Sequence, residues 1–422
     1  MLKEIPELLK AGIISPETAE RMQQYYRNKS GQAHSRLFIV FGIFGAILIG
    51  LGIILIIAHN WDEFTRPVKT MFSFLPLVVG QAFCVYAFLN KNESVAWRES
   101  ASVFLFFAVG SCISLISQVY HIPGDISSFI LTWMLLCLPV VYLMQSAVTS
   151  LLYIAGITYW AASTGYWSFP ASEPYFYWLM LAAILPFYFL LYKKNPKSNF
   201  IYFHHWFITL SITIALGTIA KGQEEWMYIA YVSLFGLFYL MSRSNFFEKN
   251  RQAVNAYSII GSAGTIIVLL ILSFTWFWED LRRANLTINS PEFFAAMIIT
   301  LIAAILFFLQ RKNRSIINFN LVEGVFLLFI CIFIVGFFSP VAVILINMLI
   351  FFIGILTIRQ GAKQDHLGIL NYGLLIISTL VVCRFFDTDL SFVVRGLLFV
   401  GVGLGFFFAN SRMLKKRQEN VQ

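Results

Sequence analysis

Histidine, carboxylate and arginine side chains stand at the ends of several long apolar segments. His59 and His121 are of a type that titrates near neutral pH, so each can act as a general base or carry a proton. Arg384 can grip a phosphate or carboxylate with paired N–H donors. We take as substrate-binding candidates the polar and aromatic residues at these segment ends: His59, Asn60, Trp61, Gln118, Tyr120, His121, Asp125, Arg384, Asp387 and Arg395.

These candidates fall into three groups along the chain, and an external pocket built from three helix ends would bring the groups together. Within the second group, Pro123 and Gly124 predict a tight turn. We expect that turn to hold His121 close to Asp125, where the carboxylate can orient the imidazole.

Arg395 lies about one turn inside an apolar segment, where a charge costs about 2.5–3.5 kcal/mol unless it pairs or reaches water. We therefore expect it to pair with Asp387 or Asp389. An alternative stays open, in which these helix ends are wet and their charges cost little. In that case Trp61 and Tyr120 are ordinary interfacial aromatic residues.

Glu323 lies inside another apolar segment, about seven residues from its predicted start and roughly 10 Å deep for a helix. A Glu at that depth can carry a coupling proton, with a hydrogen-bonded structural role as the alternative. His204 and His205 are adjacent, which separates their rings by about 100° on a helix and does not favour a metal site. The sequence predicts no metal and no cofactor, and it carries no Walker, nucleophile-elbow, zinc-helix or dinucleotide motif.

The composition shows what kind of element must position these residues. Of the 422 residues, 59% are hydrophobic and 12% are charged. A water-facing surface needs about 25% charged residues, so a soluble globular protein is excluded. The five cysteines lie inside apolar runs without paired spacing, which argues against a secreted disulfide scaffold. We expect an all-α, polytopic integral membrane helix bundle.

Apolar runs of about 17 to 25 residues, the length that crosses a hydrocarbon core as a helix, follow one another from residue 37 onward. They predict about fourteen spans, at 37–57, 69–89, 100–120, 127–145, 147–164, 174–192, 200–219, 224–241, 253–277, 293–309, 316–336, 339–358, 368–386 and 391–409. The longest external connection should run from Trp278 to about Glu292.

Most of the 30 Lys and Arg residues fall on one side of the membrane when the N-terminus is taken as cytoplasmic. The net charge of +9 is then an orientation signal, and because it is dispersed over short segments it does not indicate nucleic-acid binding. We expect both termini in the cytoplasm and a multi-pass protein of the cell inner membrane. Its parts would be a cytoplasmic helical hairpin at 1–36, the bundle at 37–409 and a basic tail at 410–422.

The N-terminal hairpin is the one soluble-looking piece. Gly12 allows a turn, Ser15 is a suitable N-cap and Pro16 suits the first position of the second helix. The hairpin either packs on membrane-proximal loops or docks a partner protein. Membrane lipids are the other expected partners.

Several short patterns resemble a known family. They are the hairpin Leu8 to Ser15, the run Ile57 to Trp61, the run Gln118 to Asp125, and Arg384 to Asp387 followed by Arg395 to Phe399. Together they resemble the bacterial predicted-membrane-protein family called domain of unknown function 2157, most clearly over residues 1–150 and also over 384–400. The resemblance implies a bacterial inner-membrane protein, and it supplies no activity or substrate.

Three hypotheses about function stay open. The favoured one is a transporter or flippase of an anionic or lipid-linked substrate, motivated by many spans, short loops, Glu323 and Arg395. The second is a membrane-embedded transferase that works at the external face with His59, His121 and Asp125. The third is a non-catalytic subunit of a membrane complex. Whether the protein is an enzyme is thus left open, because architecture does not determine function.

Overall fold

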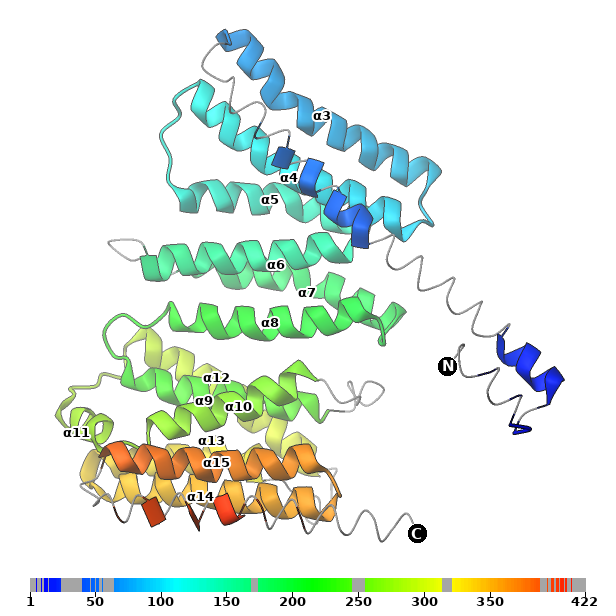
Figure 1. Cartoon of the computed structure of the whole chain (residues 1–422). Coiled ribbons are helices and arrows are strands. Elements are labelled where there is room, and N and C mark those ends of the chain that lie inside the picture. Colours follow the sequence, from blue (N-terminus) through cyan, green and yellow to red (C-terminus); the bar gives the residue numbers. More distant parts are fainter. Residues whose placement is uncertain are drawn as a thin grey trace. The chain divides into compact units, whose positions relative to one another are not determined.

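The computed structural model describes residues 64–167, 174–244, 255–312 and 321–387, together with scattered residues within 5–55 and 393–411. This described part is made of helices and contains no β-strand (Figure 1). Eight of its helices are long and apolar enough to cross a membrane, or nine if one bent pair counts as a single span. The predicted polytopic helical membrane bundle is confirmed, and fourteen remains a prediction for the number of spans.

The chain divides into two compact units. The first comprises Met1–Trp167 and Tyr175–Lys194, and the second comprises Ser168–Pro174 and Asn195–Gln422. The helices of the first unit are α3 (Arg66–Asn90), α4 (Val95–Val119), α5 (Ile126–Met144), α6 (Ala147–Ala162), a π-helical turn (Ser163–Trp167) and α7 (Phe176–Lys194). Those of the second are α8 (Asn199–Gly217), α9 (Glu225–Ser242), α10 (Ala256–Ile271), α11 (Thr275–Arg283), α12 (Pro291–Lys312), a 3₁₀ turn (Leu321–Gly324), α13 (Val325–Phe338), α14 (Val341–Lys363) and α15 (Leu367–Asp387).

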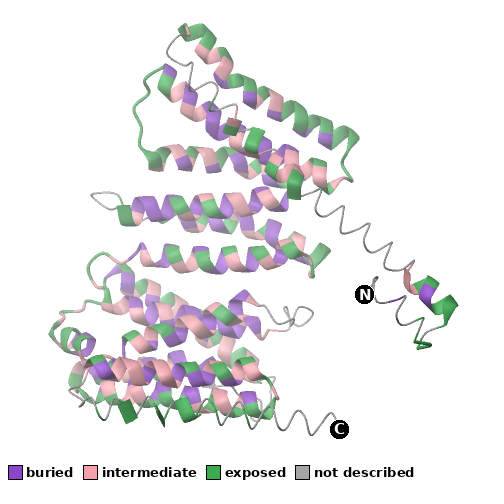
Figure 2. Cartoon of the chain, in the orientation of Figure 1, coloured by how far each residue is buried: buried purple, intermediate pink, exposed green. Residues whose placement is uncertain are grey.

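Helix α4 forms the interior of the first unit. Most of its residues are buried, whereas α3 exposes many large apolar side chains (Figure 2). Trp133 of α5 packs against α4, where its indole N–H donates to the carbonyl of Phe106 at 2.8 Å. A Cβ on Gly110 would lie 2.6 Å from the Trp133 ring, so this position needs glycine for the close approach.

Glu99 of α4 anchors the tight turn between α5 and α6. Its carboxylate accepts hydrogen bonds from the Ser146 hydroxyl, from Ala147 N at 2.9 Å and from Val148 N at 3.0 Å. These backbone N–H groups belong to the first turn of α6 and have no partner within that helix. The buried Glu99 therefore both satisfies them and complements the positive end of the helix dipole.

In the second unit a carboxylate holds a loop in a similar way. Glu292, near the start of α12, accepts from the backbone N–H groups of Lys221, Gly222 and Gln223 at 2.9, 3.1 and 3.3 Å. The loop between α8 and α9 is thereby tied to α12.

Helices α14 and α15 form a close antiparallel hairpin within the second unit (Figure 1). A Cβ on Gly361 would lie 2.3 Å from the backbone nitrogen of Leu370, and one on Gly373 would lie 2.7 Å from that of Ile358. Both glycines let the two backbones touch, as small residues do between membrane helices.

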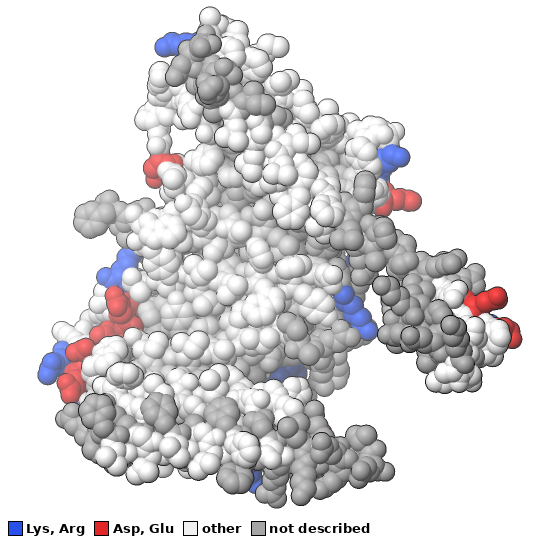
Figure 3. Space-filling model, in the orientation of Figure 1, with Lys and Arg blue, Asp and Glu red and all other residues white. Residues whose placement is uncertain are grey.

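One face of α12 is apolar and exposed. Its exposed side chains recur every three or four residues, as one face of a helix requires: Phe294, Met297, Ile298, Leu301, Ile302, Ile305, Phe308 and Leu309. Across the face drawn in Figure 3, charged side chains of the described residues are also few. A surface of this kind suits lipid acyl chains and would be unsuited to water.

Eleven of the predicted spans each coincide with one described helix, including the pairs that meet at Gln145 and at Ser339 with almost no linker. The first and last predicted spans lie largely outside the described residues. The predicted span over 253–277 is not one straight helix, because α10 ends at Ile271 and α11 begins at Thr275 with a 75° bend between them. The expected external loop after Trp278 therefore begins inside a helix.

The described residues of the N-terminal hairpin agree with the local prediction. Gly12 has a φ of 67°, a helix covers 16–23, and the Ser15 hydroxyl accepts from Thr18 N at 3.3 Å. The basic tail at 410–422 lies almost wholly outside the described residues, as does the chain at 24–39.

Candidate functional site

The break between α10 and α11 leaves backbone groups without helical partners inside an apolar bundle. Leu272, Ser273 and Phe274 connect the two helices. The last carbonyls of α10 and the first N–H groups of α11 lose their bonding partners at such a break. Each unsatisfied group would cost several kcal/mol in lipid, on the order given for buried polar groups, so other residues must bind them.

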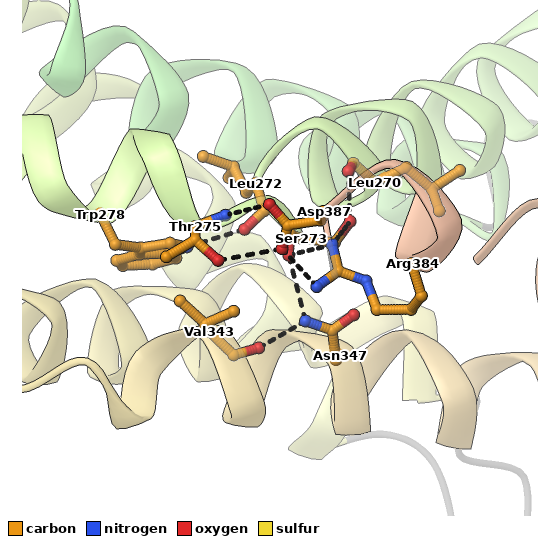
Figure 4. Close-up of polar contacts among 9 residues, drawn as sticks. All are labelled: Leu270, Leu272, Ser273, Thr275, Trp278, Val343, Asn347, Arg384 and Asp387. Carbon is orange, nitrogen blue, oxygen red and sulfur yellow. Dashed lines mark hydrogen bonds and ion pairs between the residues drawn. The ribbon is translucent and has the colours of Figure 1, made fainter. Parts of the chain in front are cut away.

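Side chains from four places satisfy the carbonyls of the break (Figure 4). The Ser273 hydroxyl donates to Leu270 O at 2.6 Å, and the Trp278 indole donates to Leu272 O at 2.7 Å. Ser273 O accepts from Arg384 Nη2 of α15 at 2.5 Å and from Asn347 Nδ2 of α14 at 3.1 Å. The break is thus a polar junction where α10, α11, α14 and α15 meet.

Asp387, at the end of the described part of α15, caps the start of α11. Its carboxylate accepts from Thr275 N at 3.1 Å and from the Thr275 hydroxyl at 2.9 Å. The side chain of an N-cap residue usually binds an N–H group of the first helical turn, but Phe274 occupies the cap position and has no polar group. A carboxylate from another helix takes that role here.

Arg384 lies one turn before Asp387 and pairs with it, Nη1 to Oδ2, at 2.7 Å. The two side chains are 21% and 9% exposed, so water screens this ion pair far less than it would at a surface. The guanidinium also lies 5.5 Å from the centre of the Phe274 ring, in a cation–π contact. Arg384 therefore has several contacts that do not depend on Asp387.

The junction combines the two features that bind oxyanions in proteins. The start of α11 presents a backbone N–H and a hydroxyl at the positive end of a helix dipole, and Arg384 presents a planar charged donor. Asp387 occupies that donor set in this structure. The arrangement can hold a carboxylate or phosphate group.

Trp278 supports the junction from within α11. It is fully buried, and a Cβ on Gly336 of α13 would lie 2.3 Å from its ring. Gly336 therefore makes room for the ring that bonds the Leu272 carbonyl.

The residues predicted at the end of α4 lie in the first unit. The Tyr120 hydroxyl is 3.1 Å from that of Thr70 on α3, and Gln118 is exposed. His121 has a left-handed φ of 50°, in a turn directly after α4. Residues 122–125, where the sequence predicts a tight turn at Pro123 and Gly124, form no such turn, and the approach of His121 to Asp125 stays a prediction. Asp125 caps α5 by accepting from Ser128 N at 3.0 Å, and the hydrogen bonds from Ser128 lower the pKa of this carboxyl below its ordinary value.

Comparison with known families bears on this part of the chain. Residues 6–150 match the family of predicted membrane proteins DUF2157. The resemblance inferred over the first 150 residues is therefore confirmed, and the DUF2157 match covers Glu99, Ser146 and the loop from Gln118 to Asp125. It does not reach 384–400, where the resemblance stays a prediction. No curated protein and no solved structure matches the chain.

Outside the DUF2157 match, Glu323 lies in the 3₁₀ turn before α13 and pairs with Arg243 at 2.8 Å. The sequence places this Glu inside a helical span, whereas it lies just before the start of α13, and its role as a proton carrier stays a prediction. His204 and His205 are buried, with His204 Nδ1 2.7 Å from Phe200 O and the His205 ring 5.3 Å from that of Tyr257. Among the described residues no group of three or more ligating side chains that could hold a metal is found.

The structure brings together one subset of the predicted residues, Arg384 and Asp387. His59, Asn60, Trp61 and Arg395 lie outside the described residues. The loop from Gln118 to Asp125 belongs to the first unit and the Arg384–Asp387 pair to the second, so the single external pocket stays a prediction.

Four residues whose side chains bond at the junction were missing from the predicted site: Ser273, Thr275, Trp278 and Asn347. Their signal was weak, because a Ser and a Thr two positions apart in an apolar run are common in membrane helices.

Proposed function

We propose that this multi-pass membrane protein is a transporter or flippase that moves an anionic substrate, and that the substrate binds at the break between α10 and α11. One observation carries the proposal: Arg384 and the start of α11 point donors at the same carboxylate inside an apolar bundle. Broken membrane helices whose half-helix ends face a ligand are a recurrent design of transporter binding sites.

The chemistry of the junction favours an anion over a cation. Arg384 and the dipole of α11 both contribute positive charge, and Asp387 is the carboxylate that balances them. A cation at this place would be repelled by Arg384. A carboxylate or a phosphate would meet donors already held in position, which reduces the cost of binding.

Lipid movement in vesicles tests the proposal. The purified full chain would be reconstituted in phosphatidylethanolamine vesicles that contain phosphatidylglycerol or phosphatidylcholine with a fluorescent label on an acyl chain. Dithionite quenches only the label in the outer leaflet. The decrease of the fluorescence that is protected in the inner leaflet therefore measures the movement of labelled lipid between the leaflets. We expect faster movement of phosphatidylglycerol than of phosphatidylcholine, reduced at least tenfold in Arg384→Gln.

A second arm uses radiolabelled inorganic phosphate inside the same vesicles, because the anion can also be a soluble one. Arg243→Gln is the matched control: it removes another ion-paired arginine of the second unit and should leave movement unchanged. Wild-type vesicles that move neither probe faster than protein-free vesicles would contradict the proposal. Equal loss in both arginine variants would contradict the assignment to this site.

We also infer that the protein resides in the cell inner membrane with both termini in the cytoplasm, which the distribution of Lys and Arg supports. Fusions of alkaline phosphatase and of a fluorescent protein to residue 422 test this. The fluorescent fusion should be bright and the phosphatase fusion inactive. The reverse pattern would contradict the orientation.

A further inference from the structure

We propose that Asp387 is a built-in substitute for the substrate, and that a phosphate-type oxyanion displaces its carboxylate from the start of α11. This inference rests on the proposed function and deepens it, because it names the binding mode and the chemical class of the ligand. The class is a phosphate group that carries or adjoins an O–H, either a lipid headgroup or free phosphate.

The donors that hold Asp387 are those that proteins use for phosphate. Thr275 N, the Thr275 hydroxyl and Arg384 Nη1 lie 3.1, 2.9 and 2.7 Å from the two carboxylate oxygens. A backbone N–H at a helix start, a hydroxyl and a guanidinium are each frequent phosphate ligands. Once the Asp387 carboxylate has left, the three donors would accept a phosphate oxyanion in its place.

Asp387 is placed so that it can leave. Among the described residues, its carboxylate bonds only to Thr275 and to the Arg384 side chain, so it can swing away without breaking a backbone hydrogen bond of α15. Arg384 would stay, because it also donates to Ser273 O and Ser273 Oγ and lies over the Phe274 ring. The exchange would therefore remove an internal anion and keep the donors that bind an external one.

Asn347 offers the junction an acceptor that the internal carboxylate does not use. Its Nδ2 donates to Ser273 O and Val343 O, whereas its buried Oδ1 has no hydrogen-bond partner among the described residues. Figure 4 draws this amide beside the Arg384 side chain. An O–H on the ligand would satisfy Oδ1, which Asp387, as a carboxylate, cannot do.

The test is the direction in which two substitutions change ligand binding. Removing the internal anion with Asp387→Asn should strengthen binding of an external anion at least threefold. Removing the donor with Arg384→Gln should weaken it at least tenfold. If both groups served stability alone, neither substitution would strengthen binding. Asp387→Ser is a second variant, in case the amide of Asn disturbs folding.

Binding would be measured on the purified full chain with two probes. Inorganic phosphate, titrated at constant ionic strength with chloride, should raise the thermal unfolding midpoint as a bound ligand does. Native mass spectrometry would count retained phosphatidylglycerol against phosphatidylcholine. Glu292→Gln, which alters another carboxylate bound by backbone N–H groups, is the matched control and should change neither result.

The outcomes distinguish a soluble phosphate from a lipid headgroup, and they distinguish the displacement of Asp387 from the proposed transport function. Tighter binding of phosphate alone indicates a soluble anion, and tighter binding of phosphatidylglycerol alone indicates a lipid headgroup. Folded Asp387→Asn and Asp387→Ser proteins that bind neither probe more tightly than wild type overturn the displacement. If Arg384-dependent lipid movement persists alongside that result, the proposed function stands. Tighter binding in the variants without movement of either probe would overturn the proposed transport function, but the assignment of an anion-binding site would stand.

Discussion

The carboxylate of Asp387 lies 3.1 Å from the backbone nitrogen of Thr275, a residue 112 positions earlier in the chain. This contact caps α11 from the end of α15 and fixes the bend between α10 and α11. The same carboxylate binds Arg384, so the geometry of the bend and the charge of the junction depend on each other.

Replacement of Thr275 by Val should destabilise the junction moderately. The change removes the hydroxyl that donates to Asp387 and keeps the backbone N–H. We expect a loss of about 1 kcal/mol, typical of one hydrogen bond, seen as a lower thermal unfolding midpoint in detergent. Thr275→Ser keeps the hydroxyl and should behave like wild type. A Val variant as stable as the Ser variant would show that the hydroxyl contributes nothing.

Replacement of Gly336 by Ala should disturb Trp278. The new Cβ would lie 2.3 Å from the indole, so either the ring or α13 must shift. Overpacking of this kind costs about 1–3 kcal/mol. It should also move the tryptophan fluorescence, because the indole loses its bond to Leu272 O. Gly124→Ala is the control, since a Cβ there meets nothing within 4 Å, and an equal effect of both would refute the packing argument.

Replacement of Glu99 by Gln should loosen the turn between α5 and α6. An amide keeps one acceptor oxygen and places an N–H donor at the other position, so either Ala147 N or Val148 N then lacks an acceptor in a buried place. We expect a loss of about 1–3 kcal/mol in the free energy of unfolding. Faster hydrogen exchange at the start of α6 should accompany it. Glu93→Gln, at an exposed site, should leave both unchanged, and intact protection in the Glu99 variant would contradict the anchoring role.

The contribution of Asp125 to stability should depend on pH in a defined direction. Because capping lowers the pKa of this carboxyl in the folded protein, its contribution is present above the ordinary Asp value of 3.8 and is lost as pH falls below it. Asp125→Asn keeps a good N-cap without titrating in this range. As pH falls from about 5 to about 3, the free energy of unfolding of wild type should therefore decrease relative to that of this variant. Parallel pH profiles would refute the cap as the cause.

The sequence was sufficient to predict most helices of this fold, because each span must be long and apolar and the basic residues mark one side. It did not predict the break at Ser273. The apolar run continues from α10 into α11, and the groups that make a break tolerable lie on α14 and α15. Hydropathy does not encode which distant side chain caps a helix.

The candidate site was predictable in the same partial way. Arg384 and Asp387 could be selected because charged residues near an apolar segment are costly. The two residues are also three positions apart, which places them on one face of a helix. Their partner, the start of α11, could not be selected without the bend. Asp125 was selected for the same reasons, and the structure shows it capping its own helix.

The most direct test of the account is an electron cryomicroscopy map of the Asp387→Asn protein in nanodiscs that contain phosphatidylglycerol, compared with wild type. We expect a bend after Ile271 in both maps, with Asp387 at Thr275 N in wild type. In the variant we expect headgroup density within hydrogen-bond distance of Thr275 N and Arg384. A continuous straight helix through 256–283, or an empty junction in the variant, would contradict the account.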